Sequence, residues 1–259
     1  MVENGQTDIS IEVFNNLSKD YNLIPIFKIL DKGKKTPVSV YKNLDNHSNT
    51  FLLESVEGNK DFARYSFIGF NPNQIIKTGD NEEFKRVDPL YKLEKELENI
   101  RTPKLENLPE FNSGAVGFIS YEAVSYFEPS VKKIEGQTSY FPESIFFITS
   151  SLIIFDNEEN KIFIISHADL RESDNFEKEY KNSLEEIKVI TKIIESSLDS
   201  VDESYHDNTN NISLKVNYLT PKEDFMKSVE ETKKLIYSGE MIQAVLSQKI
   251  TVEVGACLL

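Results

Sequence analysis

The chain has 259 residues, of which 39% are hydrophobic and 11% aromatic, and this composition predicts a globular protein with a real core. Its net charge of −14, with lysines scattered among acidic residues, argues against nucleic-acid binding. The single cysteine, Cys257, excludes an intrachain disulfide and fits a reducing compartment. The N-terminus lacks a signal-peptide pattern, and no apolar run approaches the roughly 18 residues of a membrane span, so we expect a cytoplasmic protein.

Apolar patterning over the first hundred residues predicts two helices and a series of short strands. The expected helices cover 11–21 and 89–100, and the expected strands cover 23–30, 37–41, 50–54, 65–70 and 74–77. The segments 23–30 and 37–41 are rich in Ile and Val and flank the polar residues 31–35, which is typical of two strands joined by a turn.

The middle of the chain continues this mixture. Further strands are expected over 114–121, 144–155 and 161–166, and a long helix over 175–198. Residues 156–160 carry turn-forming residues and predict a hairpin, while Gly114 and Gly117 suit a bulge or a close backbone approach. The polar, acidic residues 199–211 are expected to form a linker. Together these features indicate an α+β protein.

The clearest helix start in the chain follows this linker. Thr220 is expected to be the N-cap, with Pro221 in the first turn and Glu223 completing a capping box. Gly239 is expected to end this helix at the position just past its C-cap. Residues 241–254 then predict one extended strand.

One pair of polar residues suits the recognition of a free amino acid. Glu54 and Ser55 end an apolar strand, and a carboxylate and a hydroxyl there can meet the ammonium and carboxylate groups of such a ligand. Arg64 opens the next strand and can pair bidentately with a carboxylate. The residue types leave simpler interpretations open. Glu54 and Ser55 could be the end of a strand and the turn that follows it, and Arg64 could be a surface arginine at a strand start.

No catalytic machinery is visible in the sequence. The three histidines, His47, His167 and His206, are widely spaced and show no metal-ligand pattern. Neither a P-loop nor a dinucleotide-binding glycine motif occurs, and Cys257 lies too near the chain end to be held as a nucleophile. We therefore predict no catalytic residue and no metal ligand.

Six segments in order resemble one enzyme family. They are residues 21–26, 36–41, 51–58 (Phe-Leu-Leu-Glu-Ser-Val-Glu-Gly), 64–69 (Arg-Tyr-Ser-Phe-Ile-Gly), 114–122 and 239–248. In this combination they resemble the large subunit of anthranilate synthase, component I. The resemblance implies an α+β fold with mixed, mainly antiparallel sheets packed with helices, and an incomplete one.

The resemblance also implies a function. The family converts chorismate and ammonia to anthranilate and pyruvate in tryptophan biosynthesis with Mg²⁺, and a glutamine amidotransferase, component II, supplies the ammonia. L-Tryptophan inhibits the family by binding in its N-terminal part, through a Leu-Leu-Glu-Ser motif. That motif places the inhibitor site at Ser55, with Glu54 and Leu53 as further candidates.

The resemblance implies an N-terminal helix over 1–20, the component I N-terminal domain over 21–198, a linker over 199–218 and the start of the chorismate-binding domain over 219–259. Family members run to roughly twice this length, and their chorismate and Mg²⁺ residues lie in the C-terminal half. The family's second tryptophan-contacting segment, around an Asn-Pro…Met-Tyr motif, is absent here. We therefore expect a truncated chain that is inactive alone.

Two alternatives remain. The chain could be component I of aminodeoxychorismate synthase, which serves folate synthesis, although residues 36–39 and 54–58 favour anthranilate synthase. It could also be a non-catalytic tryptophan-binding module.

Overall fold

The computed structural model describes residues 9–44, 49–54, 64–131, 141–197 and 215–253. The chain divides into two compact units, residues 1–201 and residues 202–259. The predicted linker over 199–211 lies outside the described residues. No helix among the described residues is long and apolar enough to cross a membrane.

The first unit is built on a five-stranded antiparallel sheet, which we call the large sheet. In spatial order its strands are β1 (Leu23–Asp31), β8 (Lys161–Asp169), β7 (Ser151–Asp156), β3 (Tyr65–Phe70) and β2 (Phe51–Leu53). β3 is shared, because Tyr65 lies opposite Asp156 of β7 and Phe67 lies opposite Leu53 of β2. β2 is therefore an edge strand that is held by β3.

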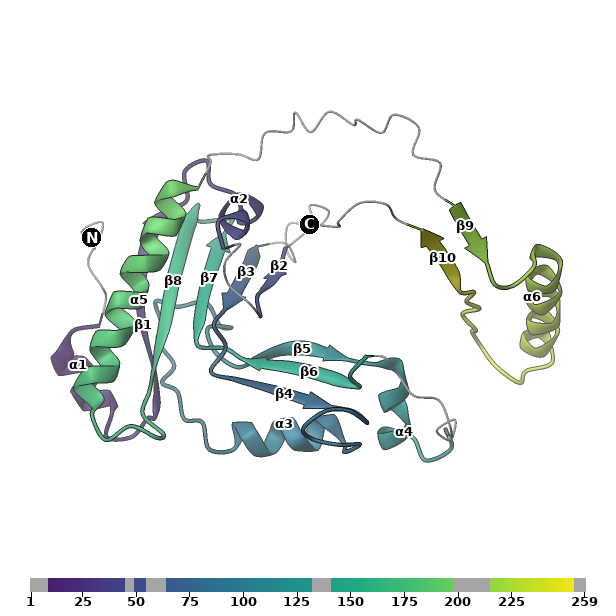
Figure 1. The fold of residues 1–259 in the computed structure, drawn as a ribbon, viewed down its shortest axis with the longest axis horizontal. Coiled ribbons are helices and arrows are strands. Elements are labelled where there is room, and N and C mark those ends of the chain that lie inside the picture. The colour runs from purple at the N-terminus through teal and green to yellow at the C-terminus, as the bar shows by residue number, and fades with distance from the viewer. Residues whose placement is uncertain (1–8, 45–48, 55–63, 132–140, 198–214, 254–259) are drawn as a thin grey trace. The chain divides into compact units, whose positions relative to one another are not determined.

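The main core lies between the large sheet and a long helix. β7 is buried at every position and β8 at seven consecutive positions, because these central strands are covered on both faces. Helix α5 (Phe176–Ser196) runs along β8 and β1, with Ile187, Ile190 and Ile194 buried at helical spacing (Figure 1). At the start of α5, the ring of Tyr180 lies 5.0 Å from that of Phe14 in α1 (Ile11–Leu17).

A three-stranded antiparallel sheet, the small sheet, completes the first unit. It contains β4 (Gln74–Thr78), β6 (Ser144–Ile148) and β5 (Ala115–Ile119), in that order. Helix α3 (Pro89–Leu97) lies along one face, where a second core forms around Ile76, Phe146 and Ile148 (Figure 1). A short 3₁₀ turn, η1 (Tyr121–Ala123), and α4 (Val124–Phe127) follow β5.

The second unit contains β9 (Lys215–Tyr218), α6 (Lys222–Tyr237) and β10 (Ile250–Glu253), and β9 and β10 pair antiparallel. None of its described residues is buried. Gly239 follows α6 with φ +81°, and the N–H groups of Gly239 and Glu240 donate to the carbonyls of Ile236 and Leu235. This Schellman arrangement confirms the predicted glycine stop.

The structure confirms the mixed α+β fold and most predicted elements, but residues 37–41 are not a strand. They lie in helix α2 (Pro37–Lys42). Thr36 and Ser39 form a capping box, in which the Thr36 hydroxyl accepts from the Ser39 N–H at 3.1 Å, and Pro37 occupies the first turn. These capping interactions outweigh the β propensity of the two valines.

The strand predicted over 144–155 is two strands in different sheets, β6 and β7. The chain leaves the small sheet at Thr149, whose N–H and hydroxyl both donate to the Gly114 carbonyl, at 2.9 and 3.1 Å. The apolar pattern continues through this crossing because both strands are largely buried.

Two predictions for the second unit are wrong. The capping box at Thr220 does not form, because Pro221 is the N-cap in an extended conformation and makes no side-chain cap bond. Among the described residues of the strand predicted over 241–254, only Ile250–Glu253 form a strand, which pairs with Lys215–Tyr218 of β9. Both differences shorten the predicted elements.

Candidate amino-acid-binding site

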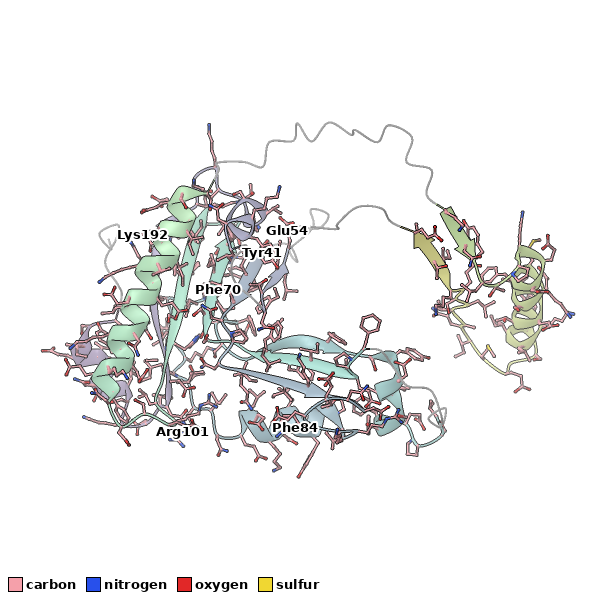
Figure 2. All side chains as sticks on the ribbon, viewed as in Figure 1. Tyr41, Glu54, Phe70, Phe84, Arg101 and Lys192 are labelled. Atoms are coloured by element: carbon pink, nitrogen blue, oxygen red, sulfur yellow. The ribbon has the colours of Figure 1, made fainter. Side chains whose placement is uncertain are left out.

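The predicted site lies at the end of the edge strand β2. Leu53 is 47% exposed, although its neighbour Leu52 packs on the main core, and Glu54 follows as an exposed residue. Figure 2 shows Glu54 at the end of β2, on the same side of the unit as Tyr41 of α2. Ser55 lies outside the described residues. This strand end thus carries a half-exposed apolar side chain followed by a solvent-accessible carboxylate.

The start of β2 is held by α2 and by β3. The Tyr41 hydroxyl lies 2.8 Å from the Thr50 hydroxyl, immediately before the strand. Phe51 lies opposite Gly69, and a Cβ atom on Gly69 would come within 2.1 Å of the Phe51 ring. A glycine at this position therefore lets the ring lie across β3.

A narrow gap, too small to hold a water molecule, lies where β2 and the large sheet meet the small sheet. Its lining is rich in aromatic side chains and consists of Asn49, Phe51, Phe70, Pro72, Phe147, Thr149 and Ser151. The Ser151 hydroxyl oxygen is buried and has no hydrogen-bond partner among the described residues. Neither Leu53 nor Glu54 lines this gap.

Arg64 makes its bidentate pair within the chain. Its guanidinium donates from Nε to both carboxylate oxygens of Asp156 at 3.1 Å and from Nη2 to Oδ2 at 2.7 Å. Burial opposes the charge on Asp156, but the Arg64 guanidinium and the N–H groups of Glu158 and Glu159 hold its pKa below the ordinary value. Arg64 therefore forms a structural ion pair with Asp156 instead of pairing with the carboxylate of a ligand.

His167 is a buried side chain rather than a ligand at the site. It lies in β8, and its Nδ1 is 2.8 Å from the carbonyl oxygen of Ser150. Burial lowers the pKa of its imidazole, against the raising effects of the Ser150 and Asn112 backbone and of Glu186 and Asp169. His47, His206 and Cys257 lie outside the described residues.

Metal binding has no support in the described part of the chain. There, no three His, Cys, Asp or Glu side chains lie close enough together to hold a metal ion. The described residues therefore offer no preformed cluster of three such ligands for a metal ion.

Sequence reasoning missed an open depression of about 640 Å³ beside the start of β4 and the end of β8. Its lining is polar and includes four acidic residues: Asn73, Gln74, Glu96, Asn99, Asp169, Arg171, Glu172, Ser173 and Glu179. Arg171 pairs bidentately with Asp169 inside it. No local pattern could have revealed it, because its residues come from separate parts of the chain.

Comparisons with known proteins agree with the fold and the motifs. The chain is 32% identical over 251 residues to anthranilate synthase component 1 of Acetivibrio thermocellus, covering 92% of this chain and 50% of that protein. It is 32% identical over 230 residues to the probable anthranilate synthase component 1 of Schizosaccharomyces pombe, covering 88% and 45%. The chain thus spans about half the length of the curated relatives that it matches.

A crystal structure of anthranilate synthase component I from Streptococcus pneumoniae TIGR4 shares the fold, with a TM-score of 0.56, 24% identity, and coverage of 88% of this chain and 49% of that chain. The family model for chorismate binding enzymes matches residues 48–257, which include parts of both units. Because this match covers most of the sequence, the chain belongs to the chorismate-binding enzyme family.

Proposed function

We propose that this chain forms part of component I of an anthranilate synthase, a lyase that converts chorismate and ammonia to anthranilate and pyruvate in tryptophan biosynthesis. The family membership and the similarity to component 1 proteins over about nine tenths of this chain support the proposal. A glutamine amidotransferase, component II, is the proposed ammonia source, and the cytoplasm is the proposed location. Mg²⁺ belongs to the proposed reaction of the whole enzyme.

The proposed role of the described residues is to sense L-tryptophan. The observation that carries it is the exposed Glu54 carboxylate directly after the half-exposed Leu53 at a strand end. A free amino acid needs a carboxylate partner for its ammonium group and apolar surface for its side chain. Glu54 and Leu53 offer these two features, and the Ser55 hydroxyl is the proposed third contact.

The composition of the chain makes binding simple to measure. The protein contains no tryptophan residue, so indole fluorescence in a mixture reports the ligand alone. We expect the anisotropy of L-tryptophan to rise on addition of the protein. Glu54→Gln should weaken binding roughly tenfold or more, because it removes a charge-assisted contact, and Ser55→Ala should also weaken it.

Glu83→Gln is a matched control, because it neutralises another exposed glutamate, beyond the end of β4. It should leave the affinity unchanged. Wild-type protein that does not bind L-tryptophan, or a Glu54→Gln variant with wild-type affinity, would reject the proposed site.

Activity is tested separately. We predict that the 259 residues alone form no anthranilate from chorismate, ammonia and Mg²⁺, since the resemblance assigns the chorismate and metal contacts to another region. Robust formation of fluorescent anthranilate by the isolated chain would refute this prediction. If aminodeoxychorismate formed instead, with or without the partner amidotransferase, the alternative synthase would be the correct assignment.

A further inference from the structure

Two bidentate arginine–aspartate pairs lie at opposite ends of the strands of the large sheet. At the strand end where β3 begins and β7 ends, Arg64 pairs with Asp156. Asp156 is 1% exposed and also accepts from the N–H groups of Glu158 and Glu159 at 3.0 Å each. At the other end, Arg171 pairs with Asp169, the residue opposite Leu23. Only the first pair lies beside the strand end that carries Glu54.

The Arg64 pair adds a side-chain contact at the start of β3, the strand that holds β2 and that pairs with β7 along its length. Arg64 directly precedes β3, and its guanidinium bonds to Asp156, the residue opposite Tyr65. The guanidinium also lies 4.9 Å from the centre of the Tyr65 ring. The pair therefore ties the first residues of β3 to the turn that follows β7.

Two further neighbouring contacts link Tyr65 to the proposed site. The Tyr65 ring lies 6.1 Å from the Phe67 ring, and Phe67 is the register partner of Leu53. β2 has three paired residues and no other strand neighbour in the described large sheet. A short edge strand sets little of its own register, so the position of Leu53 and Glu54 depends on where β3 is held.

We propose that Arg64 and Asp156 are positioning residues for tryptophan recognition at Leu53 and Glu54. The pair holds the start of β3, and β3 in turn holds the end of β2 at the place where the ligand's ammonium group meets the Glu54 carboxylate. Recognition by a charged hydrogen bond is sensitive to small displacements, so loss of the pair lowers affinity without removing any ligand contact. This inference rests on the tryptophan site proposed above.

The test compares three variants of the Arg64–Asp156 pair with one variant of the Arg171–Asp169 pair. Arg64→Lys keeps the charge but loses the fork that makes two parallel bonds, Arg64→Ala removes the side chain, and Asp156→Asn removes the carboxylate charge. Arg171→Ala removes the other bidentate pair and serves as the matched control. L-Tryptophan binding is measured by ligand anisotropy at a temperature where circular dichroism shows each variant folded.

We expect Arg64→Lys, Arg64→Ala and Asp156→Asn to bind L-tryptophan roughly tenfold more weakly, and Arg171→Ala to bind like wild type. Wild-type affinity in folded Arg64→Lys would overturn the inference while leaving the proposed site standing. An equal loss of L-tryptophan affinity in Arg171→Ala would also overturn it, because the effect would then come from general destabilisation of the fold. No binding by the wild type would reject the proposed site, and this inference with it. If Arg64→Ala fails to fold, Arg64→Lys and Asp156→Asn decide the question.

Discussion

The ring of Phe51 lies across Gly69 on the neighbouring strand, in the space that a side chain at position 69 would occupy. An aromatic ring that covers a glycine on the next strand compensates for the packing that the glycine lacks. In this protein the contact holds the start of β2 against β3, two residues before Leu53.

We predict that Gly69→Ala destabilises the fold by about 1 kcal/mol, at the low end of the overpacking range, because the half-buried ring can move aside. Urea unfolding measures this change. The same substitution in a Phe51→Ala background should cost markedly less, because the collision is gone. An equal cost in both backgrounds would show that the ring is not the cause.

Asp156→Ala is predicted to lower the free energy of unfolding by about 1–3 kcal/mol, because the turn N–H groups of Glu158 and Glu159 and the Arg64 guanidinium lose their acceptor. The pKa of Asp156 is lowered in the folded state, so its contribution is present above the ordinary value of 3.8 and is lost as pH falls below it. Unfolding followed by circular dichroism should therefore show the wild type and the variant converging in strong acid. A difference that persists there would assign the effect to packing.

His167 predicts a second pH dependence, at milder acidity. The folded-state pKa is lowered from 6.5, so the unfolded chain binds more protons below that pH. The contribution of neutral His167 to the free energy of unfolding is therefore fully present above about pH 6.5 and is lost progressively as the pH falls below that value. His167→Asn, which keeps a donor toward the Ser150 carbonyl, should show a flatter decline in unfolding free energy between about pH 7 and about pH 5. Parallel pH profiles would argue against His167 as the source.

Thr36→Ala should cost about 1 kcal/mol, because the hydroxyl that caps α2 is lost. Thr36→Ser retains the hydroxyl and should be close to wild type in urea unfolding. A large loss in Thr36→Ser would mean that the Thr36 methyl group, and not the cap, stabilises this region.

Local patterns predicted most elements because they are decided by near neighbours along the chain. Helix α5 has a sustained apolar stripe, and β3 and β4 each contain neighbouring apolar residues between turn residues. The same reasoning failed at 37–41, where Thr36, Pro37 and Ser39 form a helix cap inside a valine-rich segment. It also failed at 144–155, since an apolar run contains no signal for a change from one sheet to another.

The sequence alone determined that a carboxylate and a hydroxyl, Glu54 and Ser55, follow an apolar strand, and that their segment resembles a known inhibitor motif. The tertiary structure decided what Arg64 and His167 do. Arg64 bonds to Asp156, 92 residues away, and His167 is buried beside Ser150. Those partners depend on the order in which strands pair in the large sheet, and strand order arises from long-range packing that no local spacing encodes.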